Sequence, residues 1–310
     1  MKIGNKLTQM KNYLPFLLIT AVLSLGSCGS DKKDEAEAFL DELDEGIDTP
    51  AISEETINDI LMQVPAPLEI SMLMKESGSA YDRSILSNPD DVSKYNTTFK
   101  RAINLGIYGT DLIYTNIFGK NQEGIGYMKS VKELADDLNI GQFFNLRLVG
   151  RLATNNDNLD SLMLITTQNF NAINRYLQEN KRANLSILFL VGGWMEAVHI
   201  NCRMSIANPE VASLTERIGE QKIILENIML LMSFYAETDA SISELYEDMK
   251  KLKAAYGSIE ITYTYAEPTT EIVDGILMII DNSSSTVHIT PENVIEIDSV
   301  ITDIRNKLTS

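Results

Sequence analysis

The chain is 310 residues long and carries 44 acidic side chains against 26 lysines and arginines, a formal net charge of −18. Nucleic-acid binding requires concentrated lysine and arginine to release counterions, so this charge argues against a nucleic-acid partner. It also argues against adsorption of the protein surface to anionic lipid headgroups. At this length a chain can bury a sizeable core by packing alone, in one large domain or in two.

The first 27 residues have the pattern of a signal peptide. Lys2, Lys6 and Lys11 precede an almost wholly apolar stretch at residues 14–25, and no acid occurs among them. A membrane-spanning helix needs about 20 apolar residues. Because this stretch is shorter, we expect residues 1–27 to be removed rather than retained as a transmembrane helix.

Leu25, Gly26, Ser27 and Cys28 close the apolar stretch and resemble the lipobox of bacterial lipoproteins. The resemblance implies that Cys28 carries a diacylglyceryl group and that its freed amine carries another acyl chain, such as palmitate. One acyl chain anchors only marginally, at about 0.8 kcal/mol per buried CH₂, so several chains are needed. The implied partner is the membrane, and the implied location is the cell envelope at the outer membrane, on its periplasmic or its surface-exposed face. The alternative is an ordinary secretory signal in which Cys28 is incidental.

An acidic tether follows over residues 28–52. Its acids begin with Asp31, Asp34 and Glu35, and such a run cannot bury enough apolar surface to offset its ordering entropy. An acidic stretch directly after the lipidated cysteine also resembles the export signal of Bacteroidetes lipoproteins, although a solvated spacer has the same composition. The chain as a whole is similar to helical lipoproteins of gut-type Bacteroidetes, which implies a location and a fold but no activity.

Residues 53–257 are predicted to form a helical domain. Apolar residues recur at spacings of three and four, and capping residues, prolines and glycines separate the helices. The predicted helices cover approximately residues 54–64, 68–76, 89–119, 121–138, 159–177, 183–207, 209–235 and 241–256. Two of them are predicted from an Asn-Pro pair, Asn88-Pro89 and Asn208-Pro209, that combines a cap residue with a proline at the first position.

Residues 258–310 are predicted to be a small antiparallel β-meander plus a terminal helix packed on the helical domain. Residues 259–265 alternate between apolar and polar side chains, and turn signals precede two further strand candidates at 276–280 and 286–289. Thr290 and Pro291 begin the last helix. The predicted fold class is mainly α, a multi-helix bundle or helical array, with two related halves as one option.

Faint internal repetition marks the first candidate residues. Three polar positions on one predicted helix recur on another at an offset of 85 residues, so that Asp111, Tyr114 and Asn116 correspond to Glu196, His199 and Asn201. Duplication of a helical unit would bring the two sets to opposite walls of one cleft. Chance produces three matched positions easily, and it is the alternative explanation.

Trp194 is the only tryptophan and lies in mid-helix beside Gly192, Gly193 and Glu196. A widened helix at this point would open a pocket with an aromatic wall and a polar floor, as small-molecule sites have. Alternatively, Trp194 anchors the core and the glycines allow close approach of helices. The candidate ligand-binding residues are Trp194, Glu196, His199, Asn201, Asp111 and Tyr114.

The residues that could support catalysis are few. Glu196 and His199 form one E-x-x-H pair where di-iron bundles use two, so neither a metal nor another cofactor is predicted. His199 and Cys202 share a helix face without a third orienting group, and we expect Cys202 to be a small buried residue. The mature chain contains no G-x-S-x-G, Walker or G-x-G-x-x-G motif. We therefore expect a non-enzymatic protein with a structural or accessory role, binding a protein or glycan of the envelope. The alternative is a small-ligand-binding lipoprotein with a cleft near Trp194.

Overall fold

The computed structural model describes residues 75, 78–144, 159–273, 276–280 and 282–310. Backbone contacts divide the chain into two units, Met1–Ile47 and Asp48–Ser310, and all described residues belong to the second unit. The expected signal peptide, Cys28, the acidic tether and the helix at 54–64 lie outside the described residues. The same holds for the helix at 68–76, apart from Lys75.

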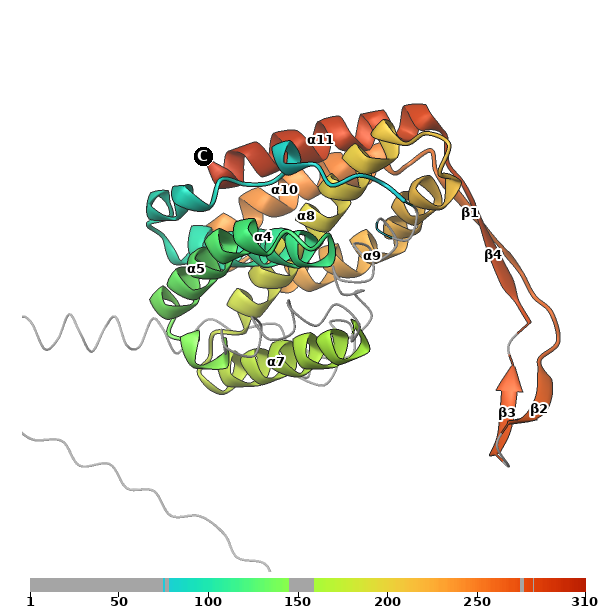
Figure 1. The fold of residues 1–310 in the computed structure, drawn as a ribbon, viewed down its shortest axis with the longest axis horizontal. Coiled ribbons are helices and arrows are strands. Elements are labelled where there is room, and N and C mark those ends of the chain that lie inside the picture. Colours follow the sequence, from blue (N-terminus) through green and yellow to red (C-terminus); the bar gives the residue numbers. More distant parts are fainter. Residues whose placement is uncertain (1–74, 76–77, 145–158, 274–275, 281) are drawn as a thin grey trace, which may run out of the picture. The chain divides into compact units, whose positions relative to one another are not determined.

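The described part is mainly α-helical with antiparallel strands before the C-terminal helix, so the predicted fold class is confirmed (Figure 1). The helices are α4 (Thr98–Ile117), α5 (Asn121–Asp137), α7 (Leu159–Glu179), α8 (Ala183–Ala207), α9 (Ala212–Ala236), α10 (Ala240–Ala255) and α11 (Pro291–Thr309). Short 3-10 helices are η1 (Arg83–Ile85), η2 (Pro89–Lys94) and η3 (Gly141–Phe143). Helix α8 contacts α4, α7, α9 and α11, so it forms the centre of the helical body.

The segment before α4 differs from the prediction of one helix over residues 89–119. Asn88 does cap a helix, but this is the short 3-10 helix η2, and α4 begins only at Thr98. The residues between the two are weak helix formers, and the Tyr108 hydroxyl donates to the Asn88 carbonyl at 2.7 Å, which holds the segment on the side of α4. The second Asn-Pro pair also precedes its helix by a short turn, because α9 begins at Ala212.

The strands form two antiparallel pairs instead of a three-stranded meander. Strand β1 (Glu260–Thr264) pairs with β4 (Ser284–His288), and β2 (Thr269–Val273) pairs with β3 (Ile276–Ile280). Strand β2 was not predicted, although four of its five residues are β-branched, a composition typical of strands. With β2 present, β3 has a neighbour of its own and β1 pairs with the last strand.

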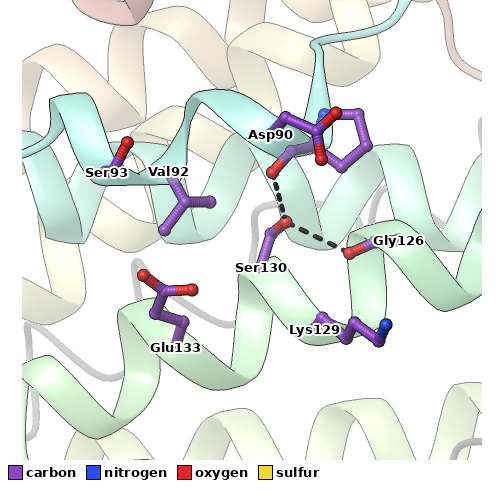
Figure 2. A pocket seen from close by; sticks show the side chains of 8 residues that line it. Asp90, Val92, Ser93, Gly126, Lys129, Ser130 and Glu133 are labelled. Carbon is purple, nitrogen blue, oxygen red and sulfur yellow. Dashed lines mark hydrogen bonds between the residues drawn. The ribbon is translucent and has the colours of Figure 1, made fainter.

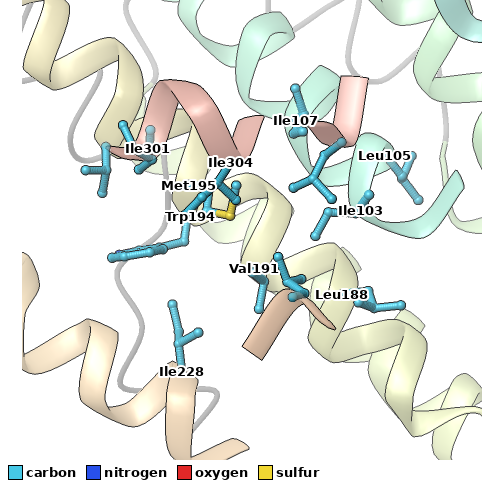
Figure 3. Close-up of a cluster of buried hydrophobic side chains, with 14 of the residues drawn as sticks. Ile103, Leu105, Ile107, Leu188, Val191, Trp194, Met195, Ile228, Ile301 and Ile304 are labelled. Carbon is cyan, nitrogen blue, oxygen red and sulfur yellow. The ribbon is translucent and has the colours of Figure 1, made fainter. Parts of the chain in front are cut away.

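The core is centred on α8, and Figure 3 shows Leu188, Val191 and Met195 among its buried apolar side chains. Helices α4 and α8 approach closely because Gly106 and Gly192 have no side chains. A Cβ atom on Gly106 would collide with the backbone of α8, and one on Gly192 would collide with the backbone of α4. These two glycines therefore allow close helix approach, as one interpretation of the sequence predicted.

Helix α8 is, within the described ranges, the one helix long and apolar enough to cross a membrane by length and composition. However, 89% of its most apolar stretch is buried inside the protein, as in the core helix of a globular domain.

Candidate functional site

A group of buried polar side chains lies where α4, α8 and α11 meet residues 79–97, the segment before α4, which we call the strap. The strap is the teal segment of Figure 1. The group, called the polar cluster, consists of Ser87, Asp111, Glu196, His199 and Arg305. Asp111 and Glu196 are fully buried, and the Arg305 side chain is only 11% exposed. Ionised side chains are rarely buried to this extent unless they are paired.

Arg305 and Glu196 form a bidentate ion pair between α11 and α8. The Arg305 Nε donates to Glu196 Oε2 at 2.5 Å, and Nη2 donates to Oε1 at 2.8 Å. The Nη2 group also donates to the Ser87 hydroxyl oxygen at 2.8 Å. The planar guanidinium thus matches one carboxylate and still has a donor for the strap.

Asp111 lies beside Glu196, and the two buried carboxyl groups influence each other's pKa. Burial, followed by the charge of Glu196, raises the pKa of Asp111 well above its usual value. Burial alone would also raise the pKa of Glu196, but the charge and hydrogen bonds of Arg305 outweigh it and lower that pKa. The Asp111 Oδ1 atom is buried and has no hydrogen-bond donor as its partner among the described residues. The Oδ2 atom accepts from the Ser87 backbone N–H at 3.1 Å.

His199 is neutral and links the strap to α11. Burial, together with the positive charges of Arg305 and Arg203, lowers its pKa to about 4. Because a carbonyl can only accept, Nε2 carries the proton and donates to the Ile85 carbonyl at 3.2 Å. The Nδ1 atom then accepts from the Thr302 hydroxyl at 3.3 Å, and that hydroxyl oxygen accepts from Arg203 at 3.1 Å.

Three of the six candidate residues lie together in the polar cluster: Asp111, Glu196 and His199. Tyr114 lies at the edge of the strap, where its hydroxyl accepts from the Asp82 backbone N–H at 3.1 Å. Its side chain is fully buried, and burial raises its pKa to about 12.

Trp194 and Asn201 are directed toward α9 and away from the polar cluster. The Trp194 indole N–H donates to Gln221 Oε1 at 2.9 Å, and the Asn201 amide donates to the Leu214 carbonyl at 3.3 Å. Trp194 is 2% exposed and belongs to the core, as Figure 3 shows. The six residues therefore do not line one common cleft, and the core-anchor interpretation describes Trp194.

Arg305 and Ser87 complete the polar cluster and were not predicted. A signal for Arg305 was present, because positions 294, 298, 301, 305 and 308 step by four and three along one face of the last helix. Asp298 and Arg305 occupy two of these positions among apolar residues, and a charged residue at an apolar position indicates a buried partner. Ser87 lies in the irregular strap, where no periodicity marks it.

A separate pocket of about 310 Å³ opens between the strap and α5. Figure 2 shows Ser130 between its two walls, donating to the Pro89 carbonyl at 2.8 Å and to the Gly126 carbonyl at 3.1 Å. The lining residues are Pro89, Asp90, Val92 and Ser93 of the strap and Gly126, Lys129, Ser130 and Glu133 of α5. None of the predicted site residues lines this pocket.

Cys202 is a buried free thiol, and burial raises its pKa well above the usual value. Within the described ranges, no group of three or more His, Cys, Asp or Glu side chains is arranged to hold a metal ion. No protein-family model, curated protein or solved structure matches this chain. The contacts of the polar cluster join the strap to three helices, α4, α8 and α11.

Proposed function

We propose that this protein is a lipid-anchored envelope lipoprotein whose helical body binds other molecules and catalyses no reaction. The observation that carries the proposal is the sequence Leu25-Gly26-Ser27-Cys28 after an apolar stretch with basic residues before it. Acyl chains on Cys28 would hold the protein at the outer membrane. The body would then act as a structural or accessory component that contacts a protein or glycan of the envelope.

The chemistry of the body supports a non-catalytic role. Catalytic groups need access to substrate and a pKa near the working pH. Glu196 is neutralised by Arg305 inside the protein, and His199 has a pKa of about 4 with both ring nitrogens hydrogen-bonded. Cys202 has a raised pKa, whereas a reactive thiol needs a lowered one.

Metabolic labelling with a clickable palmitate analogue tests the anchor. The full chain is expressed in a Gram-negative host, and wild type is compared with Cys28→Ala and with the matched control Cys202→Ala. We expect label in wild type and in Cys202→Ala, and none in Cys28→Ala. Unlabelled wild type, or label that persists in Cys28→Ala, contradicts the proposal. Protease treatment of intact cells then identifies the face of the membrane on which the body lies.

A further inference from the structure

Side chains of α4, α5 and α8 hydrogen-bond to the backbone of the strap, in addition to the contacts that the side chains of Tyr81, Arg83 and Tyr95 make. Each of six residues makes a hydrogen bond to one main-chain N–H or carbonyl group of the strap. They are Tyr114 with Asp82 N–H (3.1 Å), His199 with Ile85 O (3.2 Å), Asp111 with Ser87 N–H (3.1 Å), Tyr127 with Ser87 O (2.7 Å), Tyr108 with Asn88 O (2.7 Å) and Ser130 with Pro89 O (2.8 Å). We call these six residues the strap groove.

Main-chain groups are common to all polypeptides, so the strap groove offers its hydrogen bonds to any segment that can adopt the strap's backbone conformation, which combines the 3-10 helices η1 and η2 with extended residues between them. In peptide-binding domains, hydrogen bonds to the main chain supply affinity and pockets for side chains supply specificity. Two features of the strap would supply specificity here. The Ser87 hydroxyl accepts from Arg305 at 2.8 Å, and the Leu86 and Val92 side chains are buried.

The polar cluster beneath the strap stabilises the core less than apolar residues could. Burying two carboxyl groups and a guanidinium has a large desolvation cost, and apolar residues of similar volume are often at least as stabilising. Buried ionisable groups of this kind are enriched at functional sites, although structural ion-pair networks contain them as well. In this protein the buried ionisable residues Asp111 and Arg305 both hydrogen-bond to Ser87 of the strap. The ionisable groups therefore lie where the body contacts the strap.

The strap also leaves its surroundings incompletely filled. The pocket of about 310 Å³ separates η2 from α5, and Ser130 bridges the two sides through the Pro89 carbonyl (Figure 2). After η2 the chain is extended at Thr97, with φ −111° and ψ 153°, and Asn96 and Thr97 are exposed. The linker is therefore accessible to solvent, and Thr97 also caps α4, because its hydroxyl oxygen accepts from the Lys100 N–H at 3.1 Å.

We propose that the strap groove is a peptide-binding site occupied in cis by the strap, and that it takes up in trans a segment of a partner polypeptide with the backbone conformation of the strap, which is extended at Leu86 and Asn88 between the 3-10 helices η1 and η2. The segment would carry a small hydroxyl residue at the position of Ser87 and an apolar residue directly before it. The strap then acts as an internal competitor that keeps the site closed until a partner is present. This inference concerns the described body alone and does not depend on acylation of Cys28.

The test separates the strap from α4 while leaving both sequences intact. A protease recognition sequence is inserted between Asn96 and Thr97 of the full chain and cleaved after purification. A fluorescent peptide of residues 81–95 is added in excess, and its anisotropy is measured with cut and with uncut protein. We expect the cut protein to bind the peptide at least tenfold more tightly, because the strap on the uncut chain competes intramolecularly.

Two matched controls connect binding to the contacts above. A peptide with Ser87→Pro lacks both the N–H for Asp111 and the hydroxyl for Arg305, and it should bind at least tenfold more weakly. Tyr127→Phe in the protein removes one donor and keeps the ring, so it should weaken peptide binding by about two- to tenfold.

Several outcomes would overturn the proposal. Equal binding of the peptide to cut and uncut protein, equal binding of the Ser87→Pro peptide, or no binding would each do so. Loss of helical circular dichroism on cutting would show that the strap is part of the core instead of an occupant. Dimers formed by the cut protein without added peptide would show that the groove serves the strap of a second copy.

Discussion

Replacing Arg305 by methionine tests whether the Arg305–Glu196 ion pair is shielded from solvent, as the structure indicates. Methionine keeps the apolar stem and removes two hydrogen bonds to Glu196 and one to Ser87. Removing one partner of a buried pair costs about 3–5 kcal/mol, because the other charge stays buried without compensation. For a domain of this size a loss of 1 kcal/mol lowers Tm by about 2–4 °C, so we expect a decrease of about 6–20 °C.

The assay is urea unfolding of the purified full chain, followed by circular dichroism, at pH 7 and pH 5. The matched control is Arg217→Met, because both side chains of the Arg217–Glu220 pair are solvent-exposed, at 35% and 43%. Such a pair contributes about 0–1 kcal/mol, so Arg217→Met should lower the free energy of unfolding far less than Arg305→Met does.

The pH dependence of Arg305→Met has a definite sign. Without the guanidinium, burial raises the folded-state pKa of Glu196 above its unfolded value, and the carboxylate binds a proton on folding. Stability from a raised carboxyl pKa is present at low pH and is lost as pH rises through the folded-state pKa. The deficit relative to wild type should therefore be smaller at pH 5 than at pH 7. A deficit below about 1 kcal/mol at pH 7, or one that does not shrink at pH 5, refutes the buried-pair argument.

Three further predictions concern other parts of the body. His199 has a folded-state pKa of about 4 against an ordinary 6.5, so the unfolded chain binds the imidazole proton first as the pH falls. The free energy of unfolding should therefore decrease by about 3 kcal/mol as the pH is lowered from 6.5 to 4. His199→Gln should remove this decrease in urea titrations at pH 6.5 and pH 4. Gly106→Ala should destabilise by about 1–3 kcal/mol in thermal unfolding, because its Cβ meets the backbone of α8. The control Gly109→Ala should gain about 0.5–1 kcal/mol, since its Cβ lies 4.0 Å from the Phe189 ring. Cys202 should react with iodoacetamide only in denaturant, as followed by mass spectrometry, and rapid labelling of the folded chain would contradict its burial.

The sequence predicted regular elements well where periodicity and end signals agreed. Helix α8 was predicted at residues 183–207 and occurs as Ala183–Ala207. Prediction failed where tertiary contacts decided the backbone. The segment at residues 88–97 has a cap, a proline and acids typical of a helix start, yet Tyr108 and Ser130 donate to the Asn88 and Pro89 carbonyls and hold it as part of the strap. Contacts of this kind cannot be inferred from local spacing.

The candidate site was predictable only in part, for the same reason. Asp111, Glu196 and His199 were noticed as polar residues at matched positions, and they do lie together. Their partners come from distant parts of the chain, because Ser87 precedes Asp111 by 24 residues and Arg305 follows Glu196 by 109. Ser87 and Arg305 lie outside the two helices that carry the matched positions. From the sequence alone, a cluster filled by these two side chains could therefore not be distinguished from an open cleft.

The existence of the polar cluster follows from the register of α4 against α8. Helices α4 and α8 run parallel, because residues further along α4 contact residues further along α8. Ile103 contacts Gly192, and the Thr110 hydroxyl donates to the Gly193 carbonyl. The close approach at the glycines then places Asp111 and Glu196, each little more than one turn further on, at the same level between the helices. Two carboxylates in contact inside a protein cannot both ionise, and a nearby cation lowers the pKa of only one of them. The guanidinium of Arg305 on α11 lowers the pKa of Glu196, the pKa of Asp111 stays raised, and the Ser87 backbone N–H donates to Asp111 Oδ2.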